Sequence, residues 1–217
     1  MWKRWIGIAA LVLAIPAQAQ VELVTDGGFD DPTAAAWEFQ IYDTSTIAWA
    51  STDAAANLSS GSLLFQKKVG ENPNTLRAAQ CIEVVPGGEY SPSGTVFWPA
   101  ASDAAEGSPY LVVAWQLEPH CTGVAGDPNT SFVTIGSPPR DVWTVIGPQV
   151  VTAPAGVHSG RVLVGVIAEV NLGSPNIFEA RWDDVSVVPE PGPAAGAAVI
   201  AALVALAQRR RRAHAGG

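Results

Sequence analysis

The chain has 217 residues, 48% of them hydrophobic, which is enough for one buried core with appendages at the ends. Its formal net charge is −8, and between Gln20 and Pro189 six basic residues stand against 19 acidic ones, a balance of −13. Because so acidic a body repels phosphate backbones, the composition excludes a nucleic-acid-binding protein.

The N-terminus has the pattern of a secretory signal. Lys3 and Arg4 precede an apolar stretch over 6–15, and the Ala-Gln-Ala run at 17–19 is the small-x-small pattern that signal peptidase requires. We predict a signal peptide over 1–19 and an exported mature chain. The alternative is a membrane anchor, but the apolar stretch is shorter than the roughly 20 residues that span a bilayer.

The body from 21 to 188 alternates short β-branched and aromatic runs with turns rich in Gly, Pro, Asn and Asp. No stretch holds a sustained helical period, so we predict an all-β fold. The candidate strands are 36–42, 46–51, 62–68, 77–85, 90–98, 110–118, 131–135, 141–151, 160–170 and 176–188. Their number and spacing favour a jelly-roll β-sandwich over residues 20–188.

Strand 110–118 shows how the two faces of such a strand differ. Large apolar residues occupy one face, Leu111, Val113, Trp115 and Leu117, and we assign Trp115 to the core. Tyr110 and Gln116 lie together on the opposite face.

The two cysteines, Cys81 and Cys121, are expected to pair, because export leads to an oxidising compartment. A bridge that closes so long a loop adds about 4 kcal/mol of stability in the chain-entropy model. The alternative is two free buried thiols.

Three stretches resemble the carbohydrate-binding modules of the galactose-binding-like jelly-roll fold. They are "LVTDGGFDDPTAAAWEF" at 23–39, "AAQCIEVVPGGEYSPSGTVFW" at 78–98, and "DVWTVIGPQVVTAPAGVHSGRVLVGVIAEV" at 141–170 with "IFEARWDDVSVV" at 177–188. Their order and spacing cover nearly all of the body. The resemblance implies the same fold and a polysaccharide as the partner.

The resemblance also implies a structural calcium ion between the opening turn and the last strand. Asp30 and one of Asp183 and Asp184 match by position, with Asp26 in the turn nearby. Calcium takes six to eight oxygen ligands, and strand alternation points Asp183 and Asp184 to opposite faces, so we expect only one of them to be a ligand. The alternative is that these carboxylates are solvated or cap turn amides.

Sugar binding requires an exposed aromatic plane flanked by hydrogen-bonding groups. Trp37 and Trp143 match structural positions of the resembled pattern. The remaining candidates for the platform are Trp49, Trp98 and Tyr110, with Gln116 beside Tyr110 on one strand face. The alternative for each aromatic residue is a place in the core.

The sequence contains no pattern that indicates catalysis. His120 and His158 lie in turns, and Ser159 beside His158 has no Gly-x-Ser-x-Gly context. Glycoside hydrolysis needs two carboxyl groups that converge across a cleft, whereas strand neighbours diverge. We therefore expect no enzyme, with glycosidase or lyase activity as the less favoured reading.

The C-terminal tail, 189–217, resembles the PEP-CTERM sorting signal that exosortase-type membrane enzymes recognise in Gram-negative bacteria. Its parts are Val188, Pro189, Glu190 and Pro191, an apolar run over 194–207, and Arg209, Arg210, Arg211 and Arg212. A helix over the apolar run would rise only about 21 Å against a hydrocarbon core of roughly 30 Å, which favours a transient inner-membrane anchor. The arginines would stay cytoplasmic. The alternative is a permanent anchor that is never cleaved.

Together these patterns predict an exported, non-catalytic protein of the cell surface or extracellular matrix that binds polysaccharide. The alternative is a structural or adhesion protein without a sugar site. An exposed aromatic plane beside polar side chains would favour sugar, and an apolar edge strand would favour protein partners.

Overall fold

The computed structural model describes residues 21–41, 44–57, 60–68, 75–100, 107–122, 130–133, 138–168 and 177–191. The predicted signal peptide, the apolar run 194–207 and the arginine cluster 209–212 lie outside the described residues. Within the described ranges, no helix has the length and apolar character needed to cross a membrane.

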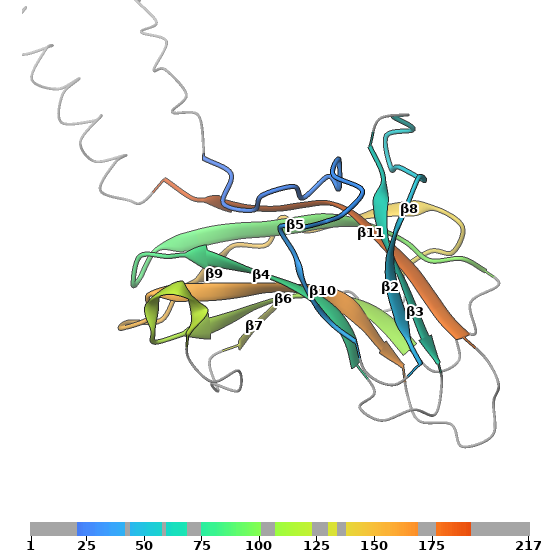
Figure 1. The fold of residues 1–217 in the computed structure, drawn as a ribbon. Helices are drawn as coiled ribbons and strands as arrows, with labels where there is room; N and C mark the ends of the chain where they lie inside the picture. Colours follow the sequence, from blue (N-terminus) through green and yellow to red (C-terminus); the bar gives the residue numbers. More distant parts are fainter. Residues whose placement is uncertain are drawn as a thin grey trace, which may run out of the picture.

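Two antiparallel sheets pack face to face, as the lower and upper layers of Figure 1 show. The lower one, sheet A, has the strand order β1-β4-β10-β6-β7. Its strands are β1 (Glu38–Gln40), β4 (Thr75–Glu83), β10 (Ser159–Ala168), β6 (Gly107–Gln116) and β7 (Thr130–Val133). The all-β fold predicted from the sequence is confirmed.

The upper layer, sheet B, has the strand order β2-β3-β11-β5-β8, and β9 pairs with β5 beside β8. Its strands are β2 (Thr46–Ala50), β3 (Ser62–Lys68), β11 (Ile177–Pro189), β5 (Glu89–Phe97), β8 (Trp143–Ile146) and β9 (Val151–Thr152). The candidate strand 141–151 is therefore divided into β8 and β9. The division falls at Gly147, whose φ is 81°, and at Pro148, which has no N–H to donate to the sheet.

The core lies between the sheets and follows the period-two pattern of the strands. Leu111, Val113 and Trp115 of β6 are buried, as their alternation predicts. Leu117, on the same face by alternation, lies one residue beyond the end of β6 and is 54% exposed. Trp182 of sheet B spans the gap between the layers and donates its indole N–H to the carbonyl of Gly165 in sheet A, at 3.1 Å.

The last strand continues into the Pro-Glu-Pro run. Pro189 pairs with Tyr90, and the backbone N–H of Glu190 donates to the carbonyl of Glu89 at 2.8 Å. The hydroxyl of Ser91 also donates to the Glu190 carboxylate. The ordered sandwich thus reaches two residues beyond the boundary at Val188 that the sequence predicts.

Cys81 and Cys121 form the predicted disulfide, with their Cα atoms 5.9 Å apart. The bridge joins β4 to a short 3-10 segment, η2 (Pro119–Cys121), which follows β6. Backbone N–H of Cys121 donates to the Ser159 hydroxyl at 3.1 Å, and that hydroxyl donates to the carbonyl of Glu118 at 2.6 Å. The disulfide therefore holds η2 against one end of sheet A.

Replacing both cysteines by serine (Cys81→Ser with Cys121→Ser) should lower the free energy of unfolding by about 2–4 kcal/mol, because the bridge closes a loop over a sequence separation of 40. Urea unfolding of the full-length chain measures this. A reductant should reproduce the loss in the wild type and leave the double variant unchanged. Equal unfolding midpoints would show that the bridge does not constrain the unfolded chain.

Candidate functional site

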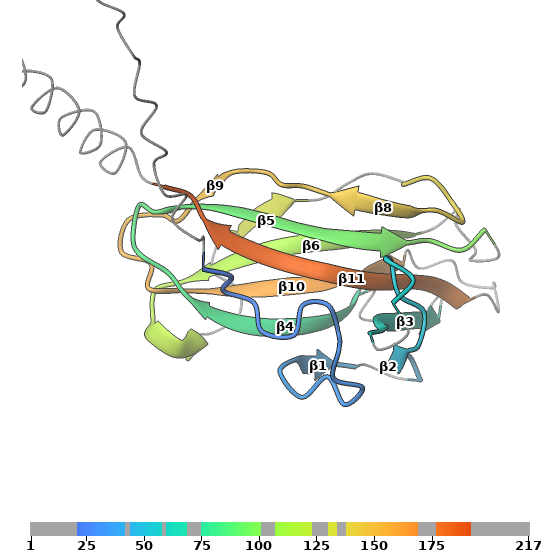
Figure 2. The same ribbon diagram turned by 90° about the horizontal axis from the view of Figure 1, so that it is seen from above.

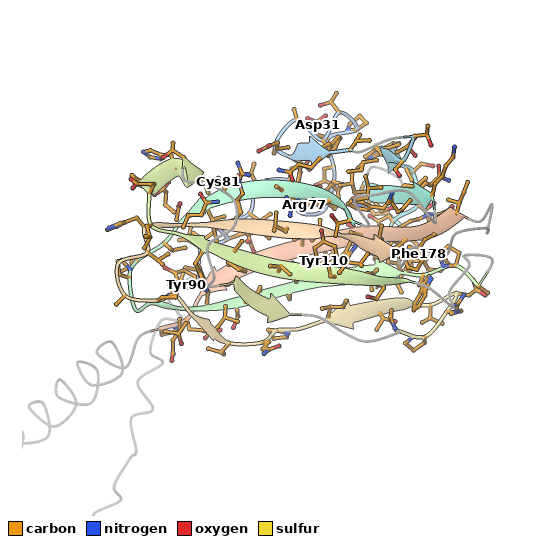
Figure 3. All side chains as sticks on the ribbon, turned by 90° about the horizontal axis from the view of Figure 1, so that it is seen from below. Asp31, Arg77, Cys81, Tyr90, Tyr110 and Phe178 are labelled. Atoms are coloured by element: carbon orange, nitrogen blue, oxygen red, sulfur yellow. A yellow bond between two sulfur atoms is a disulfide. The ribbon has the colours of Figure 1, made fainter. Side chains whose placement is uncertain are left out.

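The outer face of sheet A brings together side chains from four strands. Gly165 of β10 pairs with Arg77 of β4 on one side and with Tyr110 of β6 on the other, and Arg77 pairs in turn with Gln40 of β1. Because paired residues of neighbouring strands point to the same face, Gln40, Arg77 and Tyr110 form one row across the sheet. Figure 3 shows Arg77 and Tyr110 on this face.

Gly165 lets the phenol of Tyr110 lie across β10 within this row. A Cβ atom at position 165 would stand 3.0 Å from the Tyr110 hydroxyl oxygen and only 2.2 Å from the carbonyl oxygen of Leu76. Any side chain would therefore displace the ring, the backbone of β4, or both. The absence of a side chain at Gly165 thus keeps Tyr110 close to Arg77.

Apolar side chains form the floor of the face beside this row. Ala79, Val112 and Leu163 occupy the next row and pack together with Tyr110 in one buried cluster. Tyr110 itself is 5% exposed. The centre of the face is therefore apolar and closed to solvent, and Tyr110 is buried with the floor instead of presenting an exposed aromatic plane.

Two arginines flank the floor, Arg77 on β4 and Arg161 on β10, and both are held by partners on β1. The Nε of Arg77 donates to the side-chain oxygen of Gln40, and the Nη2 of Arg161 lies 3.3 Å from Glu38 Oε2. Fixed donors and acceptors beside an apolar floor are what recognition of a sugar ring requires.

Of the predicted platform residues, Tyr110 and Gln116 lie on this face but not in one place. They are six residues apart on β6, which corresponds to about 20 Å. Gln116 is 3% exposed beside η2, where its backbone carbonyl accepts the N–H of His158 at 3.0 Å. Tyr110 and Gln116 therefore share a strand face, as the sequence indicates, but they do not lie together.

Trp49 lies in β2 of sheet B, Trp98 directly follows β5, and both point toward the core. Trp98 is 1% exposed, and its ring centroid lies 5.5 Å from that of Phe178. The guanidinium carbon of Arg140 lies 4.4 Å from the Trp98 ring centroid. Trp49 is half-buried and donates its indole N–H to the carbonyl of Phe29 at 2.9 Å. Neither tryptophan meets Tyr110, so the four predicted platform residues do not form a single site.

The polar residues of the row, Gln40 and Arg77, were not among the site residues predicted from the sequence. The strands that carry them were predicted, but a charged residue in a half-buried strand is common and does not by itself indicate a site. The alternation of Arg77 with Ala79 could have placed the arginine on an outer face. No sequence signal shows that β4 and β6 both pair with β10.

The predicted calcium residues lie where the opening turn meets a bulge in β11. Pairing with β5 shifts register between Asp183 and Ser186, and Asp184 has a φ of 49°. Asp183 is 1% exposed, and its carboxylate accepts the N–H groups of Ala54 at 2.8 Å and of Asp184 at 2.7 Å. Asp184 is exposed, so the two carboxylates diverge, as the sequence predicts.

Negative charge accumulates at this bulge. Burial raises the pKa of Asp183 to about 6, against the hydrogen bonds from Ala54 and Asp184, and the charges of Asp184 and Asp53 raise it further. The pKa of Asp184 is raised by burial and by the charges of Asp53 and Asp30. In addition, Asp26 Oδ2 is buried and has no hydrogen-bond partner among the described residues.

The groups gathered at the bulge are carboxylates, whose oxygen atoms are suitable ligands for calcium. Asp30 and Asp184 each place a carboxylate oxygen 4.0 Å from the point where a Cβ of Gly28 would stand. However, no three carboxylate, imidazole or thiolate groups of the described chain lie close enough together to hold one metal ion. The calcium site stays a prediction.

The histidines and Ser159 lie apart from the row on sheet A. His120 Nδ1 lies 2.8 Å from Glu83 Oε1, and both side chains are exposed. The hydroxyl of Ser159 is engaged with Glu118 and Cys121 rather than with His158.

A small cavity of about 310 Å³ lies where the chain leaves the sandwich. Val85, Gly87, Gly88, Glu89, Tyr90, Pro189 and Glu190 line it. The hydroxyl of Tyr90 accepts the N–H of Val85 at 2.7 Å, so the turn between β4 and β5 is closed at this point. The cavity is not part of the row on sheet A.

The sequence matches no protein-family model and no curated relative. Solved structures, in contrast, match the fold. The xylan-binding domain CBM22-1 of Paenibacillus barcinonensis Xyn10C aligns with a TM-score of 0.51 at 12% identity, over 81% of this chain and 99% of that one. The C-terminal family 22 carbohydrate-binding module of Clostridium thermocellum Xyn10B aligns with a TM-score of 0.52 at 11% identity, over 76% and 96%.

The enzymatically active domain of tailspike protein 4 of bacteriophage CBA120 aligns with a TM-score of 0.54 at 12% identity. The alignment covers 78% of this chain but only 21% of the tailspike, so this chain spans about a fifth of that protein. At these identities the likeness concerns the fold alone. The described chain therefore has the jelly-roll β-sandwich fold of carbohydrate-binding modules, as predicted.

Proposed function

We propose that this protein is an exported, non-catalytic protein that binds polysaccharide through the outer face of sheet A. The observation that supports this most strongly is the row in which Gly165 lets Tyr110 lie close to Arg77 above an apolar floor. The fold adds support, because two of the similar structures are carbohydrate-binding modules, one of them a xylan-binding domain.

The chemistry of the face matches the two sides of a sugar ring. Tyr110, Val112 and Leu163 are 5%, 3% and 7% exposed, so a pyranose that binds here has to place its C–H groups against the edge of this apolar floor rather than flat on an open ring. The hydroxyl groups of the sugar bind the guanidinium of Arg77 and the amide of Gln40, whose geometry is already fixed by their mutual hydrogen bond.

The tail supports a proposal for localisation. Its likeness to a PEP-CTERM signal suggests export, transient anchoring in the inner membrane, processing by an exosortase-type enzyme, and delivery to the cell surface or matrix. The sandwich ends at Glu190, which β5 holds through Glu89 and Ser91. A processing enzyme would therefore meet the chain from Pro191 onward.

We also propose a structural calcium ion at the β11 bulge, held by Asp30 with Asp183 or Asp184 and with Asp26 nearby. Bound calcium would supply positive charge to carboxylates that burial and mutual repulsion now disfavour. It would join the opening turn to the last strand.

The sugar site can be tested with matched arginine variants of the full-length chain. Arg77→Ala should weaken binding to the source organism's exopolysaccharide or to xylan about tenfold, corresponding to about 1.4 kcal/mol, because it removes fixed donors beside the floor. Arg140→Ala removes the same charge far from the row and should leave the affinity unchanged. Isothermal titration measures both, and equal affinities for the two variants would contradict the proposed site.

The pH dependence of stability tests the environment of Asp183 at the bulge. Because the pKa of Asp183 is higher in the folded chain than its ordinary value of 3.8, ionisation of Asp183 destabilises the fold. In a chelator, the stability of the wild type relative to Asp183→Asn should therefore fall as pH rises from about 4 through about 6. Urea unfolding at several pH values measures this.

Calcium should oppose that fall by favouring the carboxylate, and it should raise the melting temperature of the wild type. If calcium shifts neither quantity, the calcium site does not exist. If the two chains respond in parallel to pH in the chelator, burial does not perturb Asp183.

A further inference from the structure

A second row of side chains crosses the outer face of sheet B, on the side of the sandwich opposite to the proposed sugar site. Arg181 of β11 pairs with Phe97 of β5, and Phe97 pairs with Trp143 of β8. On the other side, Arg181 pairs with Leu64 of β3. In Figure 2 none of the described strands lies over β5 and β8.

Aromatic rings occupy the β5–β8 end of this row. The ring centroids of Phe97 and Trp143 lie 5.4 Å apart with an interplanar angle of 49°, and the guanidinium carbon of Arg181 lies 5.6 Å from the Phe97 centroid. Both rings are half-buried, and Val145, two residues after Trp143 on the same face, is 65% exposed. Solvent therefore reaches an aromatic surface at the edge of sheet B.

Polar side chains form the neighbouring row of the same face, from β11 to β2. Arg181 Nη2 lies 3.1 Å from Glu179 Oε1, and Gln66 donates its amide N–H to Glu179 Oε2 at 3.2 Å. The hydroxyl of Thr46 in turn donates to the Gln66 side-chain oxygen at 3.2 Å. These groups hold one another in place before any ligand arrives, which lowers the entropic cost of binding.

The charges of this row suggest the ligand. Arg181 and Glu179 neutralise each other at the centre of the row, and the exposed Lys68 lies two residues beyond Gln66 toward the end of β3. Between them the side chains of the row offer an amide, a hydroxyl and two aromatic rings. From Gln66 on β3 to Trp143 on β8 this face extends over three inter-strand steps, about 14 Å. A neutral glycan chain has alternating C–H and hydroxyl groups that match rings and polar groups in this order.

We propose that the outer face of sheet B is a second binding surface for neutral polysaccharide, formed by Trp143, Phe97, Arg181, Glu179 and Gln66. We call it the sheet B strip. The proposal rests on the proposed function, because it gives the same class of ligand a second place on the molecule. Since the two faces point in opposite directions (Figure 1), one molecule would join two polysaccharide chains. The protein would act as a cross-linker of its matrix.

The test uses the full-length chain with soluble xylan, a neutral polymer, and with alginate, a charged one. Titration measures binding, and turbidity with viscosity measures cross-linking. We expect the wild type to bind and cross-link xylan in preference to alginate. Trp143→Ala and Gln66→Ala should still bind through sheet A but lose at least tenfold in cross-linking.

Val142→Ala is the matched control, since Val142 precedes Trp143, is exposed, and lies outside the strip. Melting curves show whether Trp143→Ala folds; if it does not, Gln66→Ala and Glu179→Gln decide the question. Undiminished cross-linking in folded variants of the sheet B strip would contradict a second binding surface there. Binding without cross-linking by the wild type would contradict it as well. Preference for alginate would overturn the neutral ligand. If the wild type binds no polysaccharide at all, the proposed function itself fails.

Discussion

The structure depends on the close contact of Gly165 with Trp182 and Tyr110. Its carbonyl accepts the indole N–H of Trp182 from the opposite sheet, and the missing side chain leaves room for Tyr110 on the outer face. Gly165 therefore joins the two sheets and shapes the outer face of sheet A. Because β10 lies at the centre of sheet A, its register fixes which residues of β4 and β6 become neighbours, and thus which side chains can meet a ligand together.

Around this centre, the segments outside the strands close the ends of the sandwich. The disulfide holds η2 against one end of sheet A. The opening segment is tied to β4 through Gln80, whose amide donates to the carbonyl of Thr25 at 2.8 Å, and to β11 through the bond from Leu23 to Val187 at 3.1 Å. The outer faces are formed by the strands of the two sheets, so each face can present a row of side chains from several strands.

The sequence predicted the strands and the disulfide because those features depend on local alternation and on compartment. It predicted less of the site for a physical reason. Alternation tells which face a residue occupies but not what covers that face, so it could not show that Tyr110 and Gln116 are both buried, Gln116 beside η2. Trp98 lies just after β5 and points into the core. Gln40 and Arg77 become neighbours of Tyr110 only through pairings between distant segments, which no local pattern encodes.

The central claim is that polysaccharide binds on the outer face of sheet A around Gly165. Nuclear magnetic resonance of the ¹⁵N-labelled chain, titrated with soluble xylan fragments and with fragments of the source organism's exopolysaccharide, tests it most directly. The account predicts saturable shifts of backbone amides in β4, β10 and β6 near Arg77, Gly165 and Tyr110. Saturable binding without shifts in these strands, or no binding of either glycan, would contradict it.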